Sequence, residues 1–566
     1  MFKLHNRLRS KTLKKIQQWR WEKQRVILTS VATTLGVVII RSLGLLQSFE
    51  WAILDEFVRW RPREPVDERI LIVGVSESDF QKYGYPISDK LLAELLTNLQ
   101  SFQPRAIGLD IYRDLPTEPG HAELVEAFET IPNLVGIELI ENAKLVGVKP
   151  PEVLKEKNQV GFNNVRVDDD GKVRRGLLYL TAAGGTSESF SLKLALIYLA
   201  EEGIRPKAAP NSRYLQLGKA VFQRFKGNDG GYVREEDDGY QILANLRGPN
   251  GSFRTVSMED ILSNKVPPEL IRDRLILIGH TASSIKDVHQ TSYNGGLFNN
   301  PQQTSGVELQ ANFLSQILSA ALEGRNSIKV WSETGEWLWI FIWSLVGANL
   351  AWKLRSPEGS VLSMLAIAFS IKGFCYLAFV VGGWWLPVVP PVLSLFGSGS
   401  AILFYRARLQ EEFKRSTEFL QSVIDAIPDP VFVKDINHRR IVLNQAYCRF
   451  IGYPLEELLS KTDYDLFSQE QADIFWKHDE LVFQQNQQQE TEEIFTDPSG
   501  VTHVIASKRS LHKDGAGNIF LVGVIRDITE RKKMEKQLKQ LASELELDNN
   551  KLRVLKETLQ QQADRD

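Results

Sequence analysis

Cysteine is scarce in this sequence, which has only Cys375 and Cys448 among its 566 residues. Neither lies between residues 49 and 336, so no disulfide stabilises that long segment. Small domains without disulfides often lack a sufficient core, whereas a segment of this length can bury one. We therefore expect residues 49–336 to fold around a hydrophobic core of their own.

An excess of basic residues is also lacking. The chain has 68 Lys and Arg against 70 Asp and Glu, which gives a formal net charge of -2. Binding to nucleic-acid phosphates needs a basic surface, so this balance excludes a nucleic-acid partner. Neither a G-x-S-x-G elbow nor an H-E-x-x-H pair occurs, which argues against a hydrolase. We predict no catalytic residue and no metal site.

Long apolar runs, in contrast, are present. A helix needs about 20 apolar residues to cross the hydrocarbon core of a bilayer, and four runs come close to that length. They are residues 26–46, 337–354, 361–381 and 384–405. We predict that each forms a transmembrane helix, the third with Lys372 packed against the neighbouring helices.

The charges beside these runs predict their direction. Residues 1–25 contain nine Lys and Arg and a single acid, and basic flanks stay in the cytoplasm. Alternation then places Lys353, Arg355 and residues 406–415 inside as well. The alternative for the first run is a cleaved signal peptide, but no small-x-small site follows Ile40, which favours an uncleaved anchor.

Segment 49–336 alternates between strand-like and helical patterns. Short apolar runs lie at 69–75, 104–112 and 274–279, and helical periodicity lies at 91–99, 123–128 and 307–322. Continuous apolar strands that alternate with helices predict an α/β domain, with a largely parallel sheet covered on both faces.

Polar residues follow several of these strands. In a parallel sheet the carboxyl ends of the strands face the ligand crevice. The candidate ligand-binding residues are therefore Ser76, Asp110, Arg113, Asp114, His280, Thr281 and Asp287. The alternative is that these residues cap helices and tie loops together, which are the usual roles of Ser, Thr and Asp.

Several short motifs of this segment occur in a familiar order. They are Trp60-Arg61-Pro62, Tyr85 to Asp89, Pro104 to Asp110, Gly161-Phe162-Asn163, Asp169 to Arg175, Leu277 to Ala282 and Gly306 to Ala311. Together they resemble the second class of CHASE domains, the extracellular sensory modules of bacterial receptors, over residues 49–405. The resemblance implies an extracytoplasmic sensory domain with an unknown ligand, followed by three transmembrane helices. With the charge pattern, it implies a multi-pass protein of the bacterial plasma membrane with both termini in the cytoplasm.

Residues 416–529 have the pattern of a small α+β unit. The predicted elements are a hairpin of 431–433 and 441–443, a short helix at 445–450, and strands at 492–496, 501–511 and 520–526. The motifs that resemble a PAS domain are Ala426 to Asp429, Asn444-Gln445-Ala446, Gly452 to Leu458 and Asp527 to Lys532. The resemblance implies a five-stranded sheet around a pocket, which such domains use for a cofactor, a small ligand or a dimer contact.

No cofactor is required by the sequence. Cys448 precedes the turn at Gly452, whereas the reactive cysteine of flavin photoreceptors follows it, so we expect a buried apolar side chain. His478 is the candidate haem ligand, but its charged neighbours indicate a solvated helix residue. Cys448 and Trp476 are the candidate residues of the PAS pocket, and Trp476 fits a packed core equally well.

Apolar residues recur at spacings of four and three on both sides of this unit, in a linker helix at 406–427 and in residues 530–566. These spacings are the heptad of a two-stranded coiled coil, so we predict a homodimer. The alternative is a single amphipathic helix that lies on the PAS-like unit.

Signatures of an output enzyme are missing. The last histidine is His512, so the coil has no phosphoacceptor, and neither a nucleotide-binding glycine loop nor a cyclase signature follows. We expect a receptor that passes an extracytoplasmic stimulus to an unknown cytoplasmic output protein. One alternative is the sensory half of a histidine kinase whose kinase is truncated or separately encoded. Another is a membrane scaffold that only dimerises.

Overall fold

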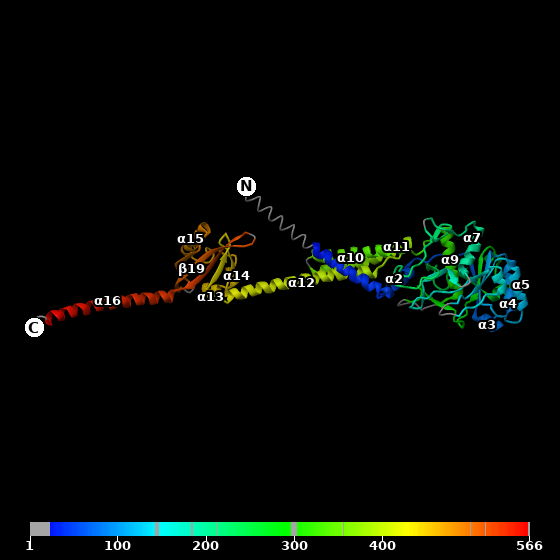
Figure 1. The fold of residues 1–566 in the computed structure, drawn as a ribbon, viewed down its shortest axis with the longest axis horizontal. Coiled ribbons are helices and arrows are strands. Elements are labelled where there is room, and N and C mark those ends of the chain that lie inside the picture. Colours follow the sequence, from blue (N-terminus) through cyan, green and yellow to red (C-terminus); the bar gives the residue numbers. More distant parts are fainter. Residues whose placement is uncertain are drawn as a thin grey trace. The chain divides into compact units, whose positions relative to one another are not determined.

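The computed structural model describes residues 23–141, 146–182, 185–210, 212–295, 303–354, 356–497, 500–515 and 517–563. Most of the basic segment 1–25 therefore lies outside the described residues. The chain divides into two compact units, residues 1–405 and 406–566 (Figure 1).

The first unit is built on a six-stranded sheet in the order β12-β1-β13-β2-β3-β4. Its strands are Ile70–Val75 (β1), Ala106–Asp110 (β2), Leu134–Glu138 (β3), Val160–Phe162 (β4), Arg254–Ser257 (β12) and Leu275–His280 (β13). Every neighbouring pair is parallel, as the sequence predicts. β1 and β2 are buried along their whole length, which explains why their sequences are continuously apolar.

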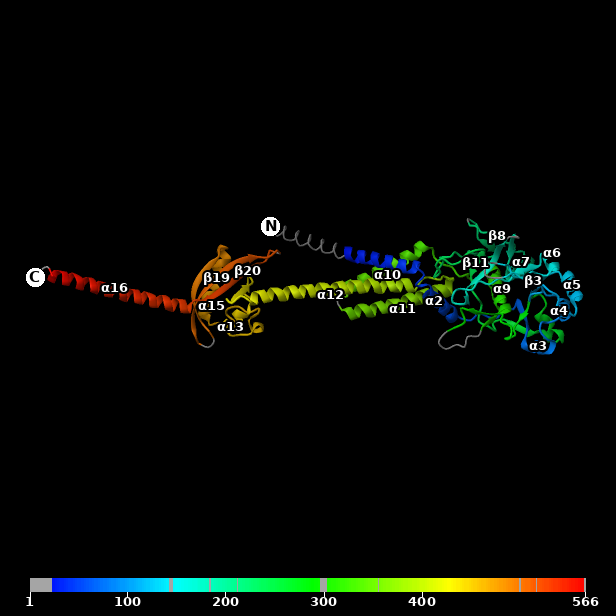
Figure 2. The same ribbon diagram turned by 60° about the horizontal axis from the view of Figure 1, so that its bottom comes forward.

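Helices cover both faces of this sheet (Figure 2). One core contains α7 (Phe190–Glu201) and α9 (Gly306–Glu323); the other contains α4 (Asp89–Ser101), α5 (His121–Thr130) and α8 (Met258–Leu262). Successive strand residues point to opposite faces, so Ile70 and Ile72 enter the first core and Leu71 and Val73 the second. Two short helices, α3 (Glu77–Tyr83) and α6 (Glu152–Glu156), complete the parallel part.

Three small sheets surround the parallel one. They have the orders β10-β9-β8, β11-β6-β7 and β15-β14-β5. Their strands are Lys172–Val173 (β5), Arg175–Ala182 (β6), Gly185–Glu188 (β7), Lys207–Ala208 (β8), Leu215–Leu217 (β9), Ala220–Phe222 (β10), Tyr240–Leu243 (β11), Val288–Thr291 (β14) and Thr304–Ser305 (β15). β14 pairs in parallel with β5, and this pairing links two distant parts of the chain.

A group of helices completes the first unit and continues from it along the chain. They are Lys23–Ser42, α2 (Gln47–Trp60), α10 (Glu333–Lys353), α11 (Pro357–Gly382) and α12 (Val389–Asp425). Serine hydroxyls connect three of them: Ser344 donates to the Ser30 carbonyl at 3.1 Å, and Ser398 donates to the Ser344 carbonyl at 2.7 Å. A Cβ at Gly347 would lie 2.1 Å from the Leu395 carbonyl oxygen, so glycine permits the close approach of α10 to α12.

Two of these helices, Lys23–Ser42 and Pro357–Gly382, are long and apolar enough to cross a membrane. The other two predicted spans lie on α10 and α12. Among the described residues, these two helices are not apolar enough by length and composition to count as candidate membrane spans. The predicted start of the last span, residue 384, is wrong because α12 begins at Val389. Trp384 instead forms a β-bridge with Lys329. Pro387 lies in the same stretch, and a proline inside a helix removes a backbone hydrogen bond. Lys372 contacts Glu56 of α2 at 2.8 Å, as a packed structural lysine would.

The second unit is a five-stranded antiparallel sheet in the order β17-β16-β20-β19-β18. Its strands are Val431–Lys434 (β16), Arg440–Leu443 (β17), Gln489–Thr496 (β18), Thr502–Lys513 (β19) and Ile519–Asp527 (β20). Its helices are α13 (Gln445–Ile451), α14 (Leu455–Leu458), α15 (Gln469–Gln485) and α16 (Thr529–Ala563). The predicted hairpin, short helix and three later strands are all present.

Candidate functional site

A cavity of about 510 Å³ lies at the carboxyl edge of the parallel sheet. Asp110 ends β2 and His280 ends β13, and both side chains line it. Asn163, just after β4, and Gln310 of α9 also contribute to its wall. The volume lies within the range of about 300–1,000 Å³ that is usual for small-molecule sites. The cavity is therefore the candidate ligand site of the first unit.

Asp110 is the most unusual residue of this cavity. The residue is only 4% exposed, and its Oδ1 accepts a hydrogen bond from the Asn163 amide at 2.7 Å. The Gln310 amide holds the Asn163 side-chain oxygen in turn. Asp110 Oδ2 has no hydrogen-bond partner among the described residues. Burial, reinforced by the nearby charge of Asp287, raises the pKa of Asp110 well above its ordinary value.

His280 and Arg113 add two further polar groups. His280 Nδ1 has no hydrogen-bond partner among the described residues, and burial lowers the pKa of the imidazole, so His280 is neutral at pH 7. Arg113 donates to the Ile87 carbonyl at 2.7 Å and lies 3.4 Å from Asp89 Oδ1. The arginine charge is therefore balanced by a carboxylate that does not line the cavity.

The structure separates the predicted site residues into two groups. Asp110, Arg113, His280 and Asp287 line the cavity. Ser76 instead forms a capping box with Asp79 at the start of α3, and the Thr281 backbone N–H donates to Val75 at 2.9 Å. Asp114 is exposed and does not line the cavity. Capping and loop-tying thus account for Ser76 and Thr281.

Two cavity residues were missed because they belong to distant segments. Asn163 lies in the motif Gly161-Phe162-Asn163, and Gln310 lies in Gly306 to Ala311. Both motifs stood out in the sequence, but nothing in the spacing indicated that their amides reach Asp110. The signal that would have found them is the presence of an amide side chain within each motif.

One wall of the cavity continues into a buried ion-pair network. Asp287 and His289 line the cavity, and the next residues of β14 pair with Lys172 and Val173 of β5. Arg174, which follows β5, donates from Nε and Nη2 to the two Asp55 oxygens of α2, each at 2.8 Å. The cavity wall and α2 are thus connected through a single strand pairing.

Further contacts hold α2 at both ends of this network. Asp168 accepts from Arg174 at 2.9 Å and from Arg175 and the Tyr232 hydroxyl at 2.8 Å each. On the other side, Glu50 Oε1 accepts from the backbone N–H groups of Val388 and Val389, at 3.0 and 2.6 Å, where α12 starts. Because buried charges are costly unless they are paired or hydrogen-bonded, these contacts fix α2 against both the parallel sheet and α12.

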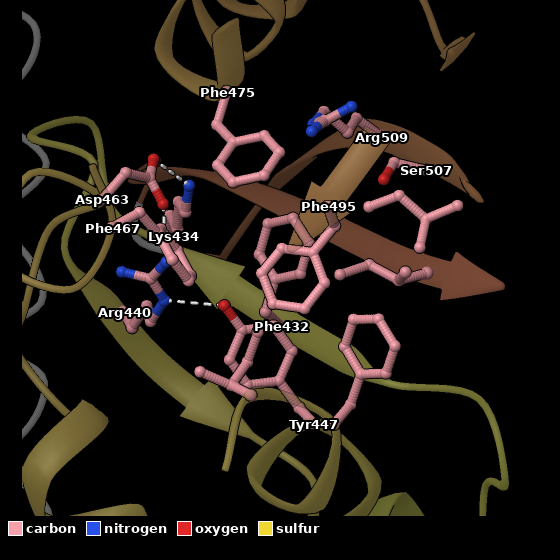
Figure 3. A pocket seen from close by; sticks show the side chains of 14 residues that line it. Phe432, Lys434, Arg440, Tyr447, Asp463, Phe467, Phe475, Phe495, Ser507 and Arg509 are labelled. Atoms are coloured by element: carbon pink, nitrogen blue, oxygen red, sulfur yellow. Dashed lines mark hydrogen bonds and ion pairs between the residues drawn. The ribbon is translucent and has the colours of Figure 1, made fainter. Parts of the chain in front are cut away.

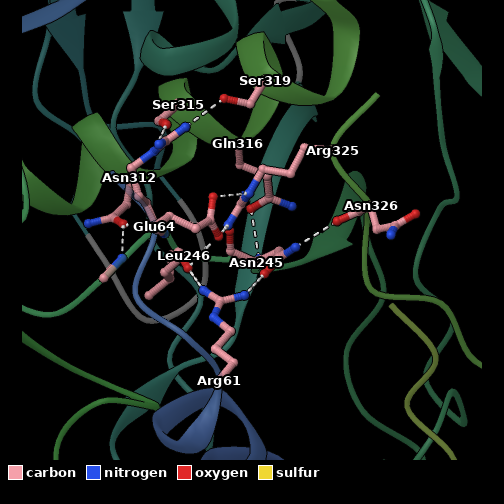
Figure 4. Close-up of polar contacts among 12 residues, drawn as sticks. Arg61, Glu64, Asn245, Leu246, Asn312, Ser315, Gln316, Ser319, Arg325 and Asn326 are labelled. Carbon is pink, nitrogen blue, oxygen red and sulfur yellow. Dashed lines mark hydrogen bonds and ion pairs between the residues drawn. The ribbon is translucent and has the colours of Figure 1, made fainter. Parts of the chain in front are cut away.

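The segment after α2 is anchored separately (Figure 4). Arg61 donates to the Asn245 side chain and the Leu246 carbonyl, and Arg325 forms a two-point ion pair with Glu64 at 2.5 and 2.7 Å. The Asn326 amide donates to the Val381 carbonyl of α11 at 3.0 Å. The Trp60-Arg61-Pro62 motif therefore belongs to the junction between the α/β domain and the helices.

A family model of the CHASE2 domain matches residues 32–349, which is more than half of the chain. The chain belongs to the CHASE2 domain family. A second model, described as a PAS fold, matches residues 424–533. A CHASE2 domain followed by a PAS domain fits a signalling sensor, and the two apolar helices fit a membrane location.

Other similar proteins match shorter parts of the chain. The uncharacterized protein y4lL of Sinorhizobium fredii is 28% identical over 121 residues, which are 21% of this chain and 15% of that protein. The PAS domain of an HTR-like protein from Haloarcula marismortui is 18% identical, with a TM-score of 0.18, over 22% of this chain and 99% of that one. The PAS domain of Bordetella pertussis BvgS is 21% identical, with a TM-score of 0.19, over 23% of this chain and 98% of that one.

The interior of the PAS domain is filled by its own side chains (Figure 3). The remaining cavity is about 20 Å³, roughly the space of one water molecule, and is too small for a haem or a flavin. The aromatic residues that line it include Phe432, Phe467, Phe475 and Phe495. Neither Cys448, which is buried in α13, nor Trp476 lines this space.

Six buried ionic groups form a network beside these rings. Lys434 Nζ contacts Asp463 at 2.5 Å and Asp479 at 2.7 Å. Arg509 contacts Asp479 at 2.9 Å and Glu493 at 2.8 Å. The sixth group, Arg440, pairs with Asp463 at 2.5 Å. Burial opposes the charge of Lys434, but the two aspartates outweigh it and raise the pKa of the lysine.

Two histidines belong to the same region. His438 stacks on Trp476 with ring centroids 3.8 Å apart, and its Nε2 lies 3.1 Å from Glu480. The expectation of a solvated His478 is wrong, because its Nδ1 lies 2.5 Å from the buried Glu493 carboxylate. The sequence neighbours of His478 gave no sign of Glu493, which comes from β18.

The PAS domain holds the helices at both of its ends. Asn444 is fully buried, and its amide nitrogen donates to the carbonyls of Ile424, Ile427 and Asp429 at 2.9–3.3 Å, around the end of α12. At the other end, Thr529 opens α16 and its hydroxyl accepts from the Val504 N–H at 2.8 Å. The sheet is therefore tied to the entering and leaving helices.

The raised pKa of Asp110 predicts a pH-dependent stability. A carboxyl whose folded-state pKa lies above its unfolded value stabilises the fold below about pH 4, and this contribution is lost as pH rises through the folded value. We expect Asp110→Asn to raise the thermal unfolding midpoint of the full chain at pH 7 more than at pH 4. Exposed Asp114→Asn is the control and should change neither midpoint. A loss of stability for Asp110→Asn at both pH values would contradict the prediction.

The buried ionic network of the PAS domain predicts that the loss of one carboxylate, that of Asp479, strongly destabilises the domain. Asp479→Ala leaves Lys434 and Arg509 without one of their buried partners, so we expect a loss of about 3–5 kcal/mol in the free energy of unfolding. Urea unfolding of residues 406–566 measures it. The matched control is Asp473→Ala on the same helix, whose partner Tyr464 is exposed, with an expected change within about 0.5 kcal/mol. Equal losses for the two variants would refute the network's role.

Proposed function

We propose that this protein is a transmembrane receptor of the bacterial plasma membrane that detects a small ligand in the CHASE2 cavity. The observation that carries the proposal is the continuity between the cavity and α2. Asp287, just before β14, and His289 of β14 line the cavity, and β14 pairs with β5, next to the Arg174–Asp55 ion pair. A ligand that moves this wall changes the position of the strand that holds α2.

The proposed membrane part consists of four helices, with the N-terminus and the PAS domain in the cytoplasm. Two helices are apolar enough to span by themselves. The serine contacts among Ser30, Ser344 and Ser398 and the close approach at Gly347 support the inclusion of α10 and α12, because small residues are typical of packed transmembrane helices. The basic residues of 1–25 and of 406–415 support a cytoplasmic location for both.

The proposed relay uses α2 and α12. Ligand binding displaces β14, the Arg174–Asp55 pair carries the displacement to α2, and Glu50 carries it to the start of α12. α12 is continuous from Val389 to Asp425, so a rotation or shift of the helix reaches its far end. There Asn444 connects it to the PAS sheet, and α16 leaves from Thr529.

We propose that the receptor acts as a homodimer joined by its helices. The apolar heptad residues of α16 are all about half exposed or more, at 58–67%. They are Met534, Leu538, Leu541, Leu545, Leu552, Leu555 and Leu559. Pairing of two such stripes removes this surface from water. The output is then a separate cytoplasmic protein, and this chain itself performs no catalysis.

A second candidate function is the sensory half of a histidine kinase whose kinase domain is supplied separately or is truncated here. The favouring observation is α16, a helix of 35 residues that leaves the PAS domain with its heptad face uncovered. Such a helix suits a direct connection to a dimeric output domain. Phosphotransfer from ATP by a chain that continues beyond residue 566 would favour this candidate.

The relay predicts that Asp55→Asn separates ligand binding from signalling. Leu541→Cys on the heptad face should form a disulfide across the dimer, at a rate that changes with ligand, whereas Ser543→Cys on the outer face should not. In the Asp55→Asn background the ligand should still bind, but the cross-linking rate should no longer respond to it. Glu68→Gln, which removes an exposed ion pair with Arg274, is the control and should respond normally. A normal response of Asp55→Asn would rule out this route.

The proposed topology predicts the activity of reporter fusions. Alkaline phosphatase, which is active only outside the cytoplasm, should be active when fused after Gly324 and inactive when fused after Arg415. The charge pattern is the reason, since the basic flanks stay inside. Activity of the fusion after Arg415 would overturn the orientation.

A further inference from the structure

Two carboxylates line the CHASE2 cavity without an adequate cationic partner. Among the described residues, Asp110 forms no ion pair, and Asp287 has only His289 Nε2 at 3.5 Å. The two aspartates repel one another, and this repulsion is one cause of the raised pKa of Asp110. Elsewhere in the same domain, Asp55, Asp67 and Asp168 are each paired with arginine. Asp110 differs from these three in having no cationic partner while it lines an open space.

The cations of the cavity wall do not supply the missing partner. Arg113 is held by the Ile87 carbonyl and lies beside Asp89. Lys286 is exposed, where solvent and salt screen its charge. His280 is neutral because burial lowers its pKa. Besides Arg113 and Lys286, the polar residues that line the space are Asp110 and Asp287, the amides Asn163 and Gln310, the histidines His280 and His289, and the tyrosines Tyr85 and Tyr112.

Asp287 and Asp110 differ in their surroundings. A Cβ at Gly306 would lie 2.3 Å from Asp287 Oδ2, so this carboxylate sits against the first turn of α9. The partial positive charge of a helix N-terminus stabilises an ionised carboxylate there. Asp110 lies deeper, and its Oδ2 is left free once Asn163 has satisfied Oδ1.

The remaining wall is aromatic and apolar. Tyr85 and Tyr112 line the cavity together with aliphatic residues that include Ile111, Leu139 and Val165. Aromatic faces attract organic cations, and aliphatic walls accept a carbon skeleton. A metal ion does not match this wall, since among the described residues no group of three or more His, Cys, Asp or Glu is placed to hold one.

We propose that the CHASE2 cavity binds an organic cation, an ammonium or amidinium ligand, whose charged head lies between Asp110 and Asp287. Its carbon skeleton then contacts Tyr85, Tyr112 and the aliphatic wall. This inference rests on the proposed function of the cavity as the ligand site. The cationic head gives Asp110 Oδ2 a hydrogen-bond donor and gives Asp287 a counter-ion. Because Asp287 directly precedes β14, the ligand contacts the start of the proposed relay.

The experiment uses the full chain in detergent micelles at pH 7.5. The cationic probes are 2-phenylethylammonium, n-pentylammonium and benzamidinium; the matched neutral and anionic probes are 2-phenylethanol, n-pentanol and benzoate. Thermal unfolding and titration calorimetry measure binding. We expect the cationic probes alone to raise the unfolding midpoint, with a Kd weakened about tenfold or more by Asp110→Asn or Asp287→Asn, since each removes a charge-assisted hydrogen bond. Asp114→Asn should bind like the parent chain.

Three results would overturn the proposal. One is that none of the cationic probes shifts the midpoint, and another is that benzoate or the alcohols shift it equally. The third is that the shift persists in the Asp110→Asn/Asp287→Asn double variant. A midpoint raised by Mg²⁺ or Ca²⁺ but by no organic cation would also overturn it, in favour of a metal site.

The Leu541→Cys cross-linking assay separates this proposal from the receptor function. If benzoate binds the cavity and changes the cross-linking rate, the organic-cation proposal fails and the receptor function stands. If a cationic probe binds in an aspartate-dependent manner but leaves cross-linking unchanged, the ligand class stands and the relay fails.

Discussion

The pairing of Arg174 with Asp55 is the contact on which the first unit depends. Their side chains are 1% and 3% exposed, so neither charge is solvated and each needs the other. This requirement connects a helix near the start of the chain to a strand more than 100 residues later. The same arginine also holds Asp168, and through that residue Arg175 and Tyr232. Together with the Lys172–Asp55 pair and the contacts of Glu50 at the start of α12, this ion pair holds α2 in place.

Buried charge has two different arrangements in this protein. In the α2 network and in the PAS interior, nearly every carboxylate has a cation within hydrogen-bond distance. In the CHASE2 cavity, Asp110 has only a neutral amide. Asp110 has no cation and lies beside an open space, with Oδ2 left without a donor among the described residues. The contrast distinguishes groups that maintain the fold from groups that face a ligand.

The strands of the parallel sheet were predicted well from the sequence because they follow from local patterns of apolar residues. The apolar runs gave β1, β2 and β13 within two residues, and the strand-end rule found Asp110 and His280. The rule also selected Ser76 and Thr281, since local capping and ligand binding use the same residue types. Asn163 and Gln310 were out of reach because their role depends on which distant segments meet. The apolar runs also predicted helices at α10 and α12, but the serine contact that joins these two helices depends on the folded structure and not on composition.

The ionic interior of the PAS domain also constrains how this protein changes over generations. Replacement of Lys434, Asp463, Asp479 or Arg509 alone leaves an opposite charge buried without its partner, whereas simultaneous replacement by apolar residues of similar volume is often neutral or stabilising. Single substitutions at these positions are therefore strongly destabilising, whereas simultaneous substitution of the whole set is tolerated. Among relatives, these positions should co-vary as a group, with either the whole ionic set or a wholly apolar core and few intermediates between them.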